Sequence, residues 1–421
     1  MARPLVPAES PESTLPEMTG ELRYMARQPI LDLRHRVHGY ELLFRSGPEL
    51  AFRGDGNLAT RIMLDNSVAF GFDRLTCGLP AFVNCTTESL VEELVDVMPP
   101  RMTVLEILES VAPTPEVIAA CRKLKGMGFR LALDDFAWDE TLLPLVELAD
   151  YIKVDFMATG PAERQQLLER LRGKQFVMVA EKVETQEEYR QARVEGFTLF
   201  QGYYFCRPEL SKNRKIPPNR ISQIQILKLL QEDPLDMHEL SQLVKRDASL
   251  THRLLRLVNS PLCAIRQEVR SIEVALIMVG DITFRHIATL AITSELNAGQ
   301  PPEILRMAFV RGRFCEQAAD LCDLSSPEQY LLGLLSLLPA MLRISMADLA
   351  PAMPLREEIR EALLGMRRRE RCLLEWLESY EQADWDHCEE VVQSNGLNRE
   401  ELIRNYIEAV SWAETVLPLA T

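Results

Sequence analysis

The chain has 421 residues, 47% of them hydrophobic, and a mean hydropathy near zero, which together describe a soluble globular protein long enough for two domains. No apolar stretch is long enough to span a bilayer, and a net charge of −15 argues against binding a nucleic-acid polymer, which needs a basic footprint. Nine scattered cysteines without a Cys-x-x-Cys pair indicate reduced thiols in a cytoplasm rather than disulfides or zinc.

Strand-like segments follow a leader that carries no structural signal. Residues 1–20 contain four prolines and no apolar signal core, so we expect them to be disordered. The runs Tyr24–Asp32 and Val37–Arg45 are strand-like, and the apolar runs Pro80–Asn84 and Thr103–Glu109 each contain polar side chains. These four runs predict strands.

Between residues 129 and 205 the chain repeats one pattern, an apolar run that ends in polar residues. The runs begin 22 to 24 residues apart, at Phe129, Tyr151, Gln175 and Phe197. This spacing leaves room for a strand, a helix and two short loops, and such runs are typical of buried parallel strands. With the upstream strands, they predict a closed (β/α) barrel over residues 21–209.

Helices are expected between these strands and throughout the second half. One is predicted from Pro115 to about Met127, before Gly128, and a capping box formed by Thr185 and Glu188 marks the start of another. A polar, proline-bearing linker is expected over residues 210–220. Beyond it, apolar residues recur at three- and four-residue steps, which predicts an all-α domain over 221–421.

Polar side chains that could carry chemistry stand within or just after the predicted barrel strands. They are Glu41, Asn84, Glu106, Asp134, Asp135, Lys153, Glu181, Glu184 and Gln201. A buried, unpartnered charge is very costly, so we expect these groups at the strand C-termini, where such barrels build active sites. The set is rich in oxygen ligands without His or Cys, which favours Mg²⁺ or Mn²⁺, and acid pairs with a lysine suit two-metal displacement at phosphorus. The alternative is a set of ordinary solvated acids.

Eight motifs in this order, RQPI, GYELLFR, VNCT, EILE, LALDDF, KVDF, AEKVET and FQGYYF, resemble an EAL domain, the cyclic di-GMP phosphodiesterase barrel. The resemblance covers residues 23–208. The chain is specifically similar to the subgroup in which an HDOD domain follows the EAL barrel. It implies a TIM-like barrel that hydrolyses cyclic di-GMP to linear pGpG with Mg²⁺ or Mn²⁺, two ions per site.

The resemblance also implies a role for each site residue. Four residues would hold one metal: Glu41, Asn84, Glu106 and Asp134. Asp135 would hold the second, Lys153 would orient the water or the phosphate, and Glu181 would be the general base or a second-metal ligand. Glu184 and Gln201 would support the metal–water cluster. Arg45 would contact a phosphate oxygen and Gln28 would contact the nucleotide. Glu109 would anchor the loop after Asp135.

Three positions depart from the family pattern. The signature is Glu-Leu-Leu instead of Glu-Ala-Leu, which changes a packing side chain but not the ligand. Lys182 stands where most members have glycine. The Gly-containing loop that usually follows Asp135 is replaced by Phe136–Thr141. This change would alter the rate of catalysis and the usual geometry of a homodimer, but not the metal site itself.

The segments 243–260 and 271–280 resemble the HDOD domain, a helical relative of HD phosphohydrolases. None of the six histidines is followed by Asp, so no HD metal core is expected and this half is interpreted as a regulatory or partner-binding module. Three functions remain open: an active cyclic di-GMP phosphodiesterase, an inactive cyclic di-GMP receptor that signals through the HDOD domain, and a scaffold that works only through the HDOD surface.

Overall fold

The computed structural model describes residues 24–45, 76–92, 94–206, 216–259, 269–366 and 368–417. The predicted leader and part of the predicted linker lie outside these ranges, as do the side chains of Tyr24, Met25, Phe44 and Arg45. Contacts divide the chain into two compact units. One takes in the described residues up to 206 together with Glu378–Glu390, and the other takes in the remaining residues from 216 onward.

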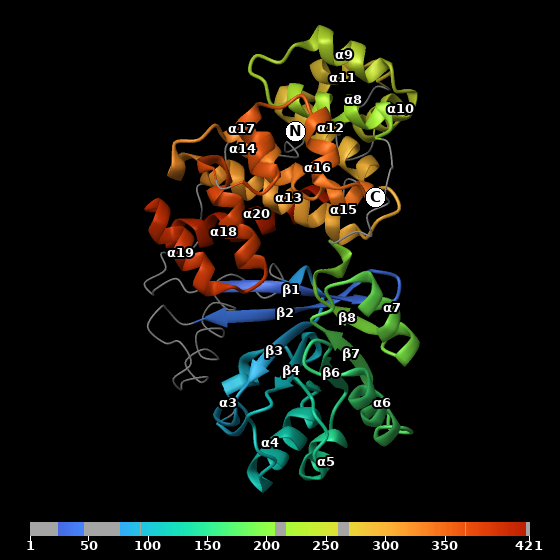
Figure 1. The fold of residues 1–421 in the computed structure, drawn as a ribbon, viewed down its shortest axis with the longest axis vertical. Helices are drawn as coiled ribbons and strands as arrows, with labels where there is room; N and C mark the ends of the chain where they lie inside the picture. Colours follow the sequence, from blue (N-terminus) through green and yellow to red (C-terminus); the bar gives the residue numbers. More distant parts are fainter. Residues whose placement is uncertain are drawn as a thin grey trace, which may run out of the picture. The chain divides into compact units, whose positions relative to one another are not determined.

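Eight strands close into a barrel in chain order (Figure 1). They are β1 Tyr24–Asp32, β2 Val37–Arg45, β3 Ala81–Cys85, β4 Thr103–Ile107, β5 Arg130–Leu133, β6 Tyr151–Asp155, β7 Val177–Glu181 and β8 Leu199–Gln201. From β2 to β8, each strand pairs in parallel with the next one along the chain. The predicted fold class, a (β/α) barrel followed by a helical half, is confirmed.

Strand β1 is antiparallel to both of its neighbours, β2 and β8. Only residues 33–36 separate β1 from β2, and a parallel crossover needs a dozen residues or more. Asp32 closes the turn, because its Oδ1 accepts hydrogen bonds from the backbone N–H groups of Arg34 and Arg36 at 2.8 and 2.9 Å. The short connection therefore forces a hairpin where the barrel closes.

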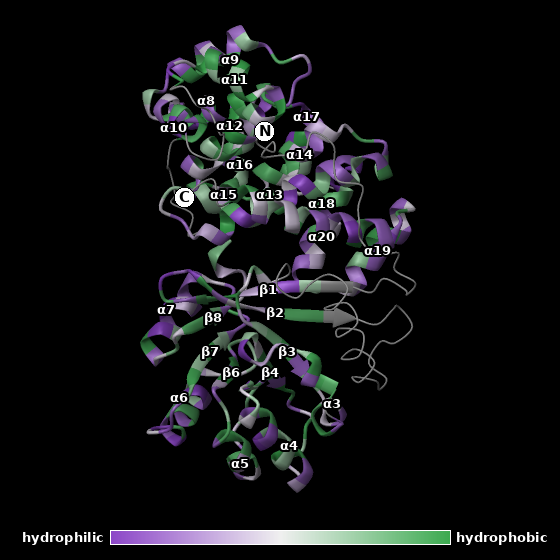
Figure 2. Ribbon diagram, turned by 180° about the vertical axis from the view of Figure 1, so that it is seen from behind, coloured by the Kyte–Doolittle hydropathy of each residue, from purple (hydrophilic) through white to green (hydrophobic). Residues whose placement is uncertain are grey.

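Helices and short 3-10 turns follow the parallel strands. They are α3 Thr87–Val91, η1 Leu94–Val97, η2 Pro100–Met102, α4 Pro115–Gly126, η3 Glu140–Leu142, α5 Leu143–Val146, α6 Pro161–Arg170, α7 Gln186–Glu195 and η4 Tyr203–Phe205. The helix predicted before Gly128 is confirmed as α4, and the capping box at Thr185 and Glu188 is confirmed at the start of α7. Figure 2 shows α6 and α7 as largely hydrophilic, as expected for helices on the outside of a barrel.

An apolar layer fills the inside of the barrel. Seven of the eight strands each contribute one buried residue: Ile30, Phe82, Val104, Ala132, Tyr151, Val179 and Leu199. Strand β2 contributes Gly39, where a Cβ atom would lie 2.6 Å from the carbonyl oxygen of Pro80 and 2.9 Å from the Phe82 ring. The glycine thus makes room for Phe82 in this layer.

The second half is helical. Its elements are α8 Pro218–Leu229, α9 Met237–Lys245, α10 Ala248–Val258, α11 Ile272–Val279, α12 Asp281–Leu296, α13 Pro302–Ala318, η6 Ala319–Cys322, α14 Ser326–Leu335, α15 Leu338–Leu342, α16 Met346–Leu349, η7 Ala350–Ala352, α17 Glu357–Leu363, η8 Arg369–Arg371, α18 Cys372–Glu381, α19 Trp385–Asn395 and α20 Arg399–Val416. Asp247 caps α10 by accepting from the backbone of Leu250 at 3.0 Å, and Asn259 exchanges two hydrogen bonds with the backbone of Val269. Both residues stabilise helix ends.

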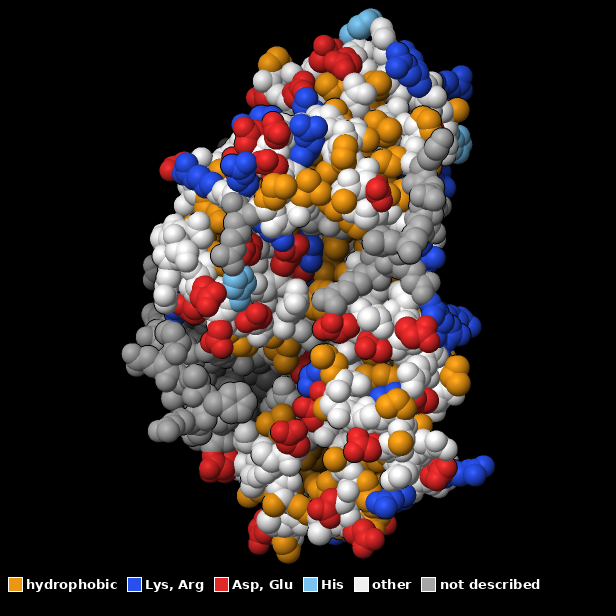
Figure 3. Space-filling model, in the orientation of Figure 1, with side chains coloured by type: hydrophobic (Ala, Val, Ile, Leu, Met, Phe, Trp, Pro, Cys, Tyr) orange, Lys and Arg blue, Asp and Glu red, His pale blue; other side chains and the backbone are white. Residues whose placement is uncertain are grey.

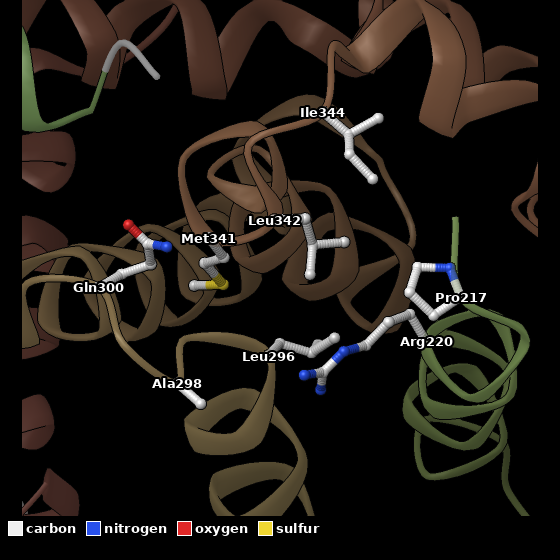
Figure 4. A pocket seen from close by; sticks show the side chains of 8 residues that line it. All are labelled: Pro217, Arg220, Leu296, Ala298, Gln300, Met341, Leu342 and Ile344. Carbon is white, nitrogen blue, oxygen red and sulfur yellow. The ribbon is translucent and has the colours of Figure 1, made fainter. Parts of the chain in front are cut away.

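A small cavity of about 130 Å³ lies in the helical half between the start of α8, the end of α12 and α15 (Figure 4). Leu296, Met341 and Leu342 line it together with Arg220. Arg220 is engaged elsewhere, because it donates to Gln223 Oε1 at 2.9 Å and to the Glu295 carbonyl at 3.0 Å. Sites for small molecules usually measure about 300–1,000 Å³, so this cavity is too small for a dinucleotide.

Among the described residues, no single helix has both the length and the apolar character to cross a membrane; only the bent pair Ser326–Leu342 and Met346–Ala352 meets that test, by length and composition. On the face drawn in Figure 3, basic side chains are scattered among acidic ones.

Candidate active site

A polar layer lies directly above the apolar layer at the carboxyl ends of the parallel strands. Moving two residues along each strand from the apolar layer reaches Asn84, Glu106, Asp134, Lys153, Glu181 and Gln201. Gln28 precedes Ile30 by two residues, because β1 runs in the opposite direction. Side chains two residues apart in a strand point to the same face, so all of these groups point into the barrel, and Glu41 joins them from β2.

Lys153 lies at the centre of this layer and is fully buried. Its Nζ is 2.7 Å from Glu106, 2.7 Å from Glu181, 2.8 Å from Asp134 and 3.1 Å from Glu41. One ammonium therefore faces four carboxylates, which leaves a formal charge of −3 when all of them are ionised. A cluster with this excess of negative charge is costly in a buried place.

Amide side chains surround one of the four carboxylates, that of Glu41. Gln201 donates through Nε2 to Glu41 Oε2 at 2.6 Å and to Gln28 Oε1 at 3.0 Å. Asn84 donates through Nδ2 to Glu41 Oε1 at 3.4 Å. Glu41 is thus held by donors from β3, β6 and β8, so its position is fixed before any ligand binds.

The pKa values of the buried acids are displaced upward. Burial, followed by repulsion from Glu41, raises the pKa of Glu106 well above its ordinary value. Burial also raises the pKa of Glu181 to about 8, against the opposing attraction of Lys153. Burial alone would lower the pKa of Lys153, but its four carboxylate neighbours raise it on balance. The lysine therefore stays charged, while Glu181 keeps its proton to a higher pH than an ordinary glutamate does.

A second, more exposed cluster borders the first. Asp135 follows Asp134 with φ 41°, and Lys182 follows Glu181 with φ 52°. Both residues therefore adopt the left-handed conformation, which non-glycine residues seldom take and which is found at functional sites. Lys182 Nζ is 2.5 Å from Asp155 Oδ2 and 3.6 Å from Asp135 Oδ2. Burial and the neighbouring Asp134 raise the pKa of Asp135, although Lys182 opposes the change.

The remaining predicted residues lie at the periphery or outside the described part. Glu184 is half-buried, and its backbone N–H donates to Glu188 Oε2 at 2.8 Å. Glu109 is exposed, and its negative charge contributes to the raised pKa of Asp135. The backbone of Arg45 ends β2, but its side chain is outside the described residues. In the altered loop, Phe136 is buried and its backbone N–H donates to the Lys153 carbonyl at 2.9 Å.

The donor set fits a hard divalent cation by its chemistry. Several oxygens are buried there without a hydrogen bond: Asn84 Oδ1, both Oε atoms of Glu106, Asp135 Oδ1, Glu181 Oε2 and Gln201 Oε1. Glu106 Oε1 does lie 2.7 Å from Lys153 Nζ, outside hydrogen-bonding geometry. No three acidic, His or Cys side chains of the described chain already converge at metal-ligand distances; the Lys153 ammonium lies between the carboxylates. Mg²⁺ and Mn²⁺ prefer such oxygen ligands.

Sequence reasoning did not assign a function to Lys182, which the structure places against two acids of the site. The available signal was its position directly after Glu181, at the carboxyl end of β7. Asp155 has a structural role: its Oδ1 accepts from the backbone N–H groups of Met157 and Ala158 at 2.7 and 2.9 Å.

Comparisons with known proteins match both halves of the chain. A model of the EAL domain matches residues 76–208 and a model of the HDOD domain matches residues 216–375. Gln28 and Glu41 precede the first match, but Glu41 is tied to the matched part through Lys153 and Gln201. The chain is 24% identical to Klebsiella pneumoniae BlrP1 in a calcium/cy-diGMP complex, with a TM-score of 0.37 over 44% of this chain and 55% of that one. That TM-score is too low to bear on the site.

Two relatives span almost the whole chain. The uncharacterized protein YuxH of Bacillus subtilis is 32% identical over 405 residues, which cover 94% of this chain and 98% of that protein. The cyclic di-GMP phosphodiesterase CdgJ of Vibrio cholerae is 33% identical over 407 residues, which cover 93% of each. Together with the two domain matches in this order, they show that the chain belongs to the family in which an EAL domain is followed by an HDOD domain.

Proposed function

We propose that this chain hydrolyses one of the two 3′–5′ phosphodiester bonds of cyclic di-GMP and releases linear pGpG. The observation that carries the proposal is the Lys153 ammonium inside a ring of four carboxylates at the mouth of the barrel. The EAL domain match and the relative named a cyclic di-GMP phosphodiesterase support the same substrate.

The cofactor in this proposal is Mg²⁺ or Mn²⁺, with two ions per site. Glu41, Asn84, Glu106 and Asp134 would hold one ion, and Asp135 would hold the other. A bound cation of this kind polarises a phosphoryl oxygen and lowers the pKa of a bound water. It would also offset the excess negative charge of the cluster.

The chain's own groups do the remaining work. The buried ammonium of Lys153 is oriented by its carboxylate neighbours, so it can direct a water molecule or a phosphate oxygen without reorganisation. The pKa of Glu181 is raised to about 8 in the cation-free protein. Bound cations would favour its ionised form, which would then accept a proton from the attacking water. In the reaction a bond forms between the water oxygen and phosphorus, the bond from phosphorus to the 3′ oxygen breaks, and the 3′ oxygen takes up a proton.

Other residues would contact the nucleotide or support the site. Gln28 and Arg45 would contact the nucleotide and a phosphate oxygen, and Gln201 would keep Glu41 in place through its 2.6 Å hydrogen bond. Glu184 would support the cation–water cluster, and Glu109 would anchor the loop after Asp135. The helical half would act as a regulatory or partner-binding module. Any homodimer would form through contacts between EAL barrels.

The decisive experiment follows the product by chromatography. Purified full-length protein is incubated with cyclic di-GMP and either Mg²⁺ or Mn²⁺, beside Glu41→Gln and the exposed control Glu147→Ala. We expect metal-dependent pGpG from the wild type and the control, and a loss of at least about a hundredfold in Glu41→Gln. Binding of cyclic di-GMP without turnover would overturn the enzymatic proposal and leave the receptor, while absence of both would leave the scaffold.

A further inference from the structure

The side chain of Lys182 occupies a defined place beside the polar layer. It is the first residue after β7, and 52% of its side chain is exposed. Its ammonium pairs with Asp155 at 2.5 Å and lies 3.6 Å from Asp135. Asp135 is the acid that the proposed function assigns to the second divalent cation, so a fixed positive charge already stands at that position.

Neighbouring hydrogen bonds fix the direction of this side chain. The backbone on either side is tied down, because the Glu181 carbonyl accepts from Phe156 N–H at 3.1 Å and Val183 N–H donates to the Gln201 carbonyl at 2.9 Å. At the other end, Asp155 uses Oδ1 for two backbone N–H groups and Oδ2 for Lys182. Lys182 is therefore anchored at both ends next to Asp135.

We propose that Lys182 is a built-in cation that competes with the second divalent ion for Asp135 and so sets the affinity of that position. The inference rests on the proposed function, since it concerns the second of the two cations. Like charges a few ångströms apart repel strongly in a partly buried site, so a divalent ion at Asp135 must displace the ammonium. The long, half-exposed lysine stem allows that displacement toward solvent.

Two classes of cation affinity follow. The position formed by Glu41, Asn84, Glu106 and Asp134 has more carboxylates than the single charge of Lys153 can neutralise, so it fills first. The position at Asp135 fills only at higher cation concentration, when Lys182 has moved away. Lys182 is thus a positioning residue that makes the second step depend on the concentration of free divalent cation.

The test is a calorimetric titration of metal-free full-length protein with Ca²⁺, Mg²⁺ or Mn²⁺ in the absence of nucleotide. Lys182→Met removes the charge and keeps an unbranched side chain of similar length. Lys182→Gly removes the side chain at a backbone angle that glycine adopts freely, so this variant is expected to fold. Lys182→Arg keeps the charge, and Lys123→Met is a matched loss of one exposed lysine on α4.

A neighbouring positive charge commonly lowers the pKa of a carboxylate by about 1–3 units, which is a tenfold or greater loss of affinity for a proton, and a divalent cation at the same oxygens meets the same repulsion. We therefore expect the weaker binding event to tighten by at least about tenfold in Lys182→Met and Lys182→Gly. It should stay weak in Lys182→Arg and Lys123→Met. Equal second affinities in the wild type and Lys182→Met would overturn the inference, and so would absence of cation binding in every variant.

The titration separates this inference from the proposed function. A tighter second event in Lys182→Met supports the inference even where the wild type releases no pGpG, a result that overturns only the proposed function. Conversely, wild-type turnover with unchanged cation affinities in the Lys182 variants keeps the function and removes the role of Lys182.

Discussion

The polar layer of the barrel and the ion pairs of the helical half arrange their acidic side chains in opposite ways. In the barrel four carboxylates face one ammonium, and the pKa values of Glu106 and Glu181 are raised. In the helical half many acids pair with a basic partner, as in Glu303–Arg306, Glu328–Arg356 and Glu273–Lys245. Hydrogen bonds from Lys245 and Ser241 lower the pKa of Glu273 to about 2.

This difference separates a site from a scaffold. Paired surface charges contribute little energy and disturb nothing around them. Buried acids that outnumber their partners lower stability, and such clusters persist mainly where their chemistry is used. The barrel cluster is therefore the candidate for chemistry, whereas the ion pairs of the helical half are ordinary partners that contribute little to its stability.

The largest effect is expected from Lys153→Met. Removing one partner of a buried charge cluster usually costs about 3–5 kcal/mol, because the carboxylates of Glu41, Glu106, Asp134 and Glu181 then repel one another without compensation. Denaturant unfolding of the metal-free protein measures this loss. Added Ca²⁺ should stabilise the variant more than the wild type, since the cation replaces the missing charge, while pGpG formation is lost.

The matched change in the other half is Lys245→Met. Its ion pair with Glu273 is exposed, with 58% of the lysine and 43% of the glutamate side chain accessible, so we expect a change below about 1 kcal/mol. A comparable loss from both substitutions would mean that the Lys153 cluster carries no excess charge when the protein is folded.

A glycine in each half gives the second comparison. At Gly202, with φ 136°, a Cβ atom would overlap the Val183 carbonyl oxygen; at Gly333 it would overlap the Arg311 carbonyl oxygen between α13 and α14. Gly202→Ala is expected to cost roughly 2–4 kcal/mol through strain and overpacking, and Gly333→Ala roughly 1–3 kcal/mol. Calorimetry should show weaker Ca²⁺ binding only in Gly202→Ala, because only that change moves Gln201 and the Lys182 segment.

Much of the barrel could be predicted because strand periodicity and the cost of burying charge act on every residue alike. Apolar runs that end in Asp134, Lys153 and Glu181 leave their polar groups only one stable place, the mouth of the barrel. The end of α4 before Gly128 and the start of α7 after Thr185 follow from capping residues close by in the sequence. These features depend on neighbours in sequence, so they can be inferred from sequence.

The rest depends on contacts between distant residues. Lys153 alone could have been a surface residue at a strand end, and its central place appears only when β2, β4 and β7 close around it. Lys182 pairs with Asp155 and Asp135 while Lys182 and Asp135 adopt left-handed backbone conformations. No local sequence pattern predicts these conformations. Hence the sequence predicted which residues belong to the site better than it predicted which of them contact one another.

The slope of stability with pH should also differ in sign between the halves. The pKa of Glu181 is about 8 in the folded protein, above its ordinary value of 4.5. Between these values the folded state keeps a proton that the unfolded state has released, so the stability of the metal-free barrel falls as pH rises, by on the order of 1.4 kcal/mol per pH unit. Above about pH 8 the slope ends.

Glu273 provides the opposite case within the same chain. Its pKa is about 2 when folded, below its ordinary value of 4.5, so its contribution is present above pH 4.5 and is lost as pH falls toward 2. Hydrogen exchange of peptides from β7 and α11, measured between pH 5 and 9, reports the two halves separately. We expect the β7 slope to vanish in Glu181→Gln and α11 to stay flat in both proteins. A β7 slope that survives Glu181→Gln would assign the proton to another acid of the cluster, of which Glu106 is the most deeply buried.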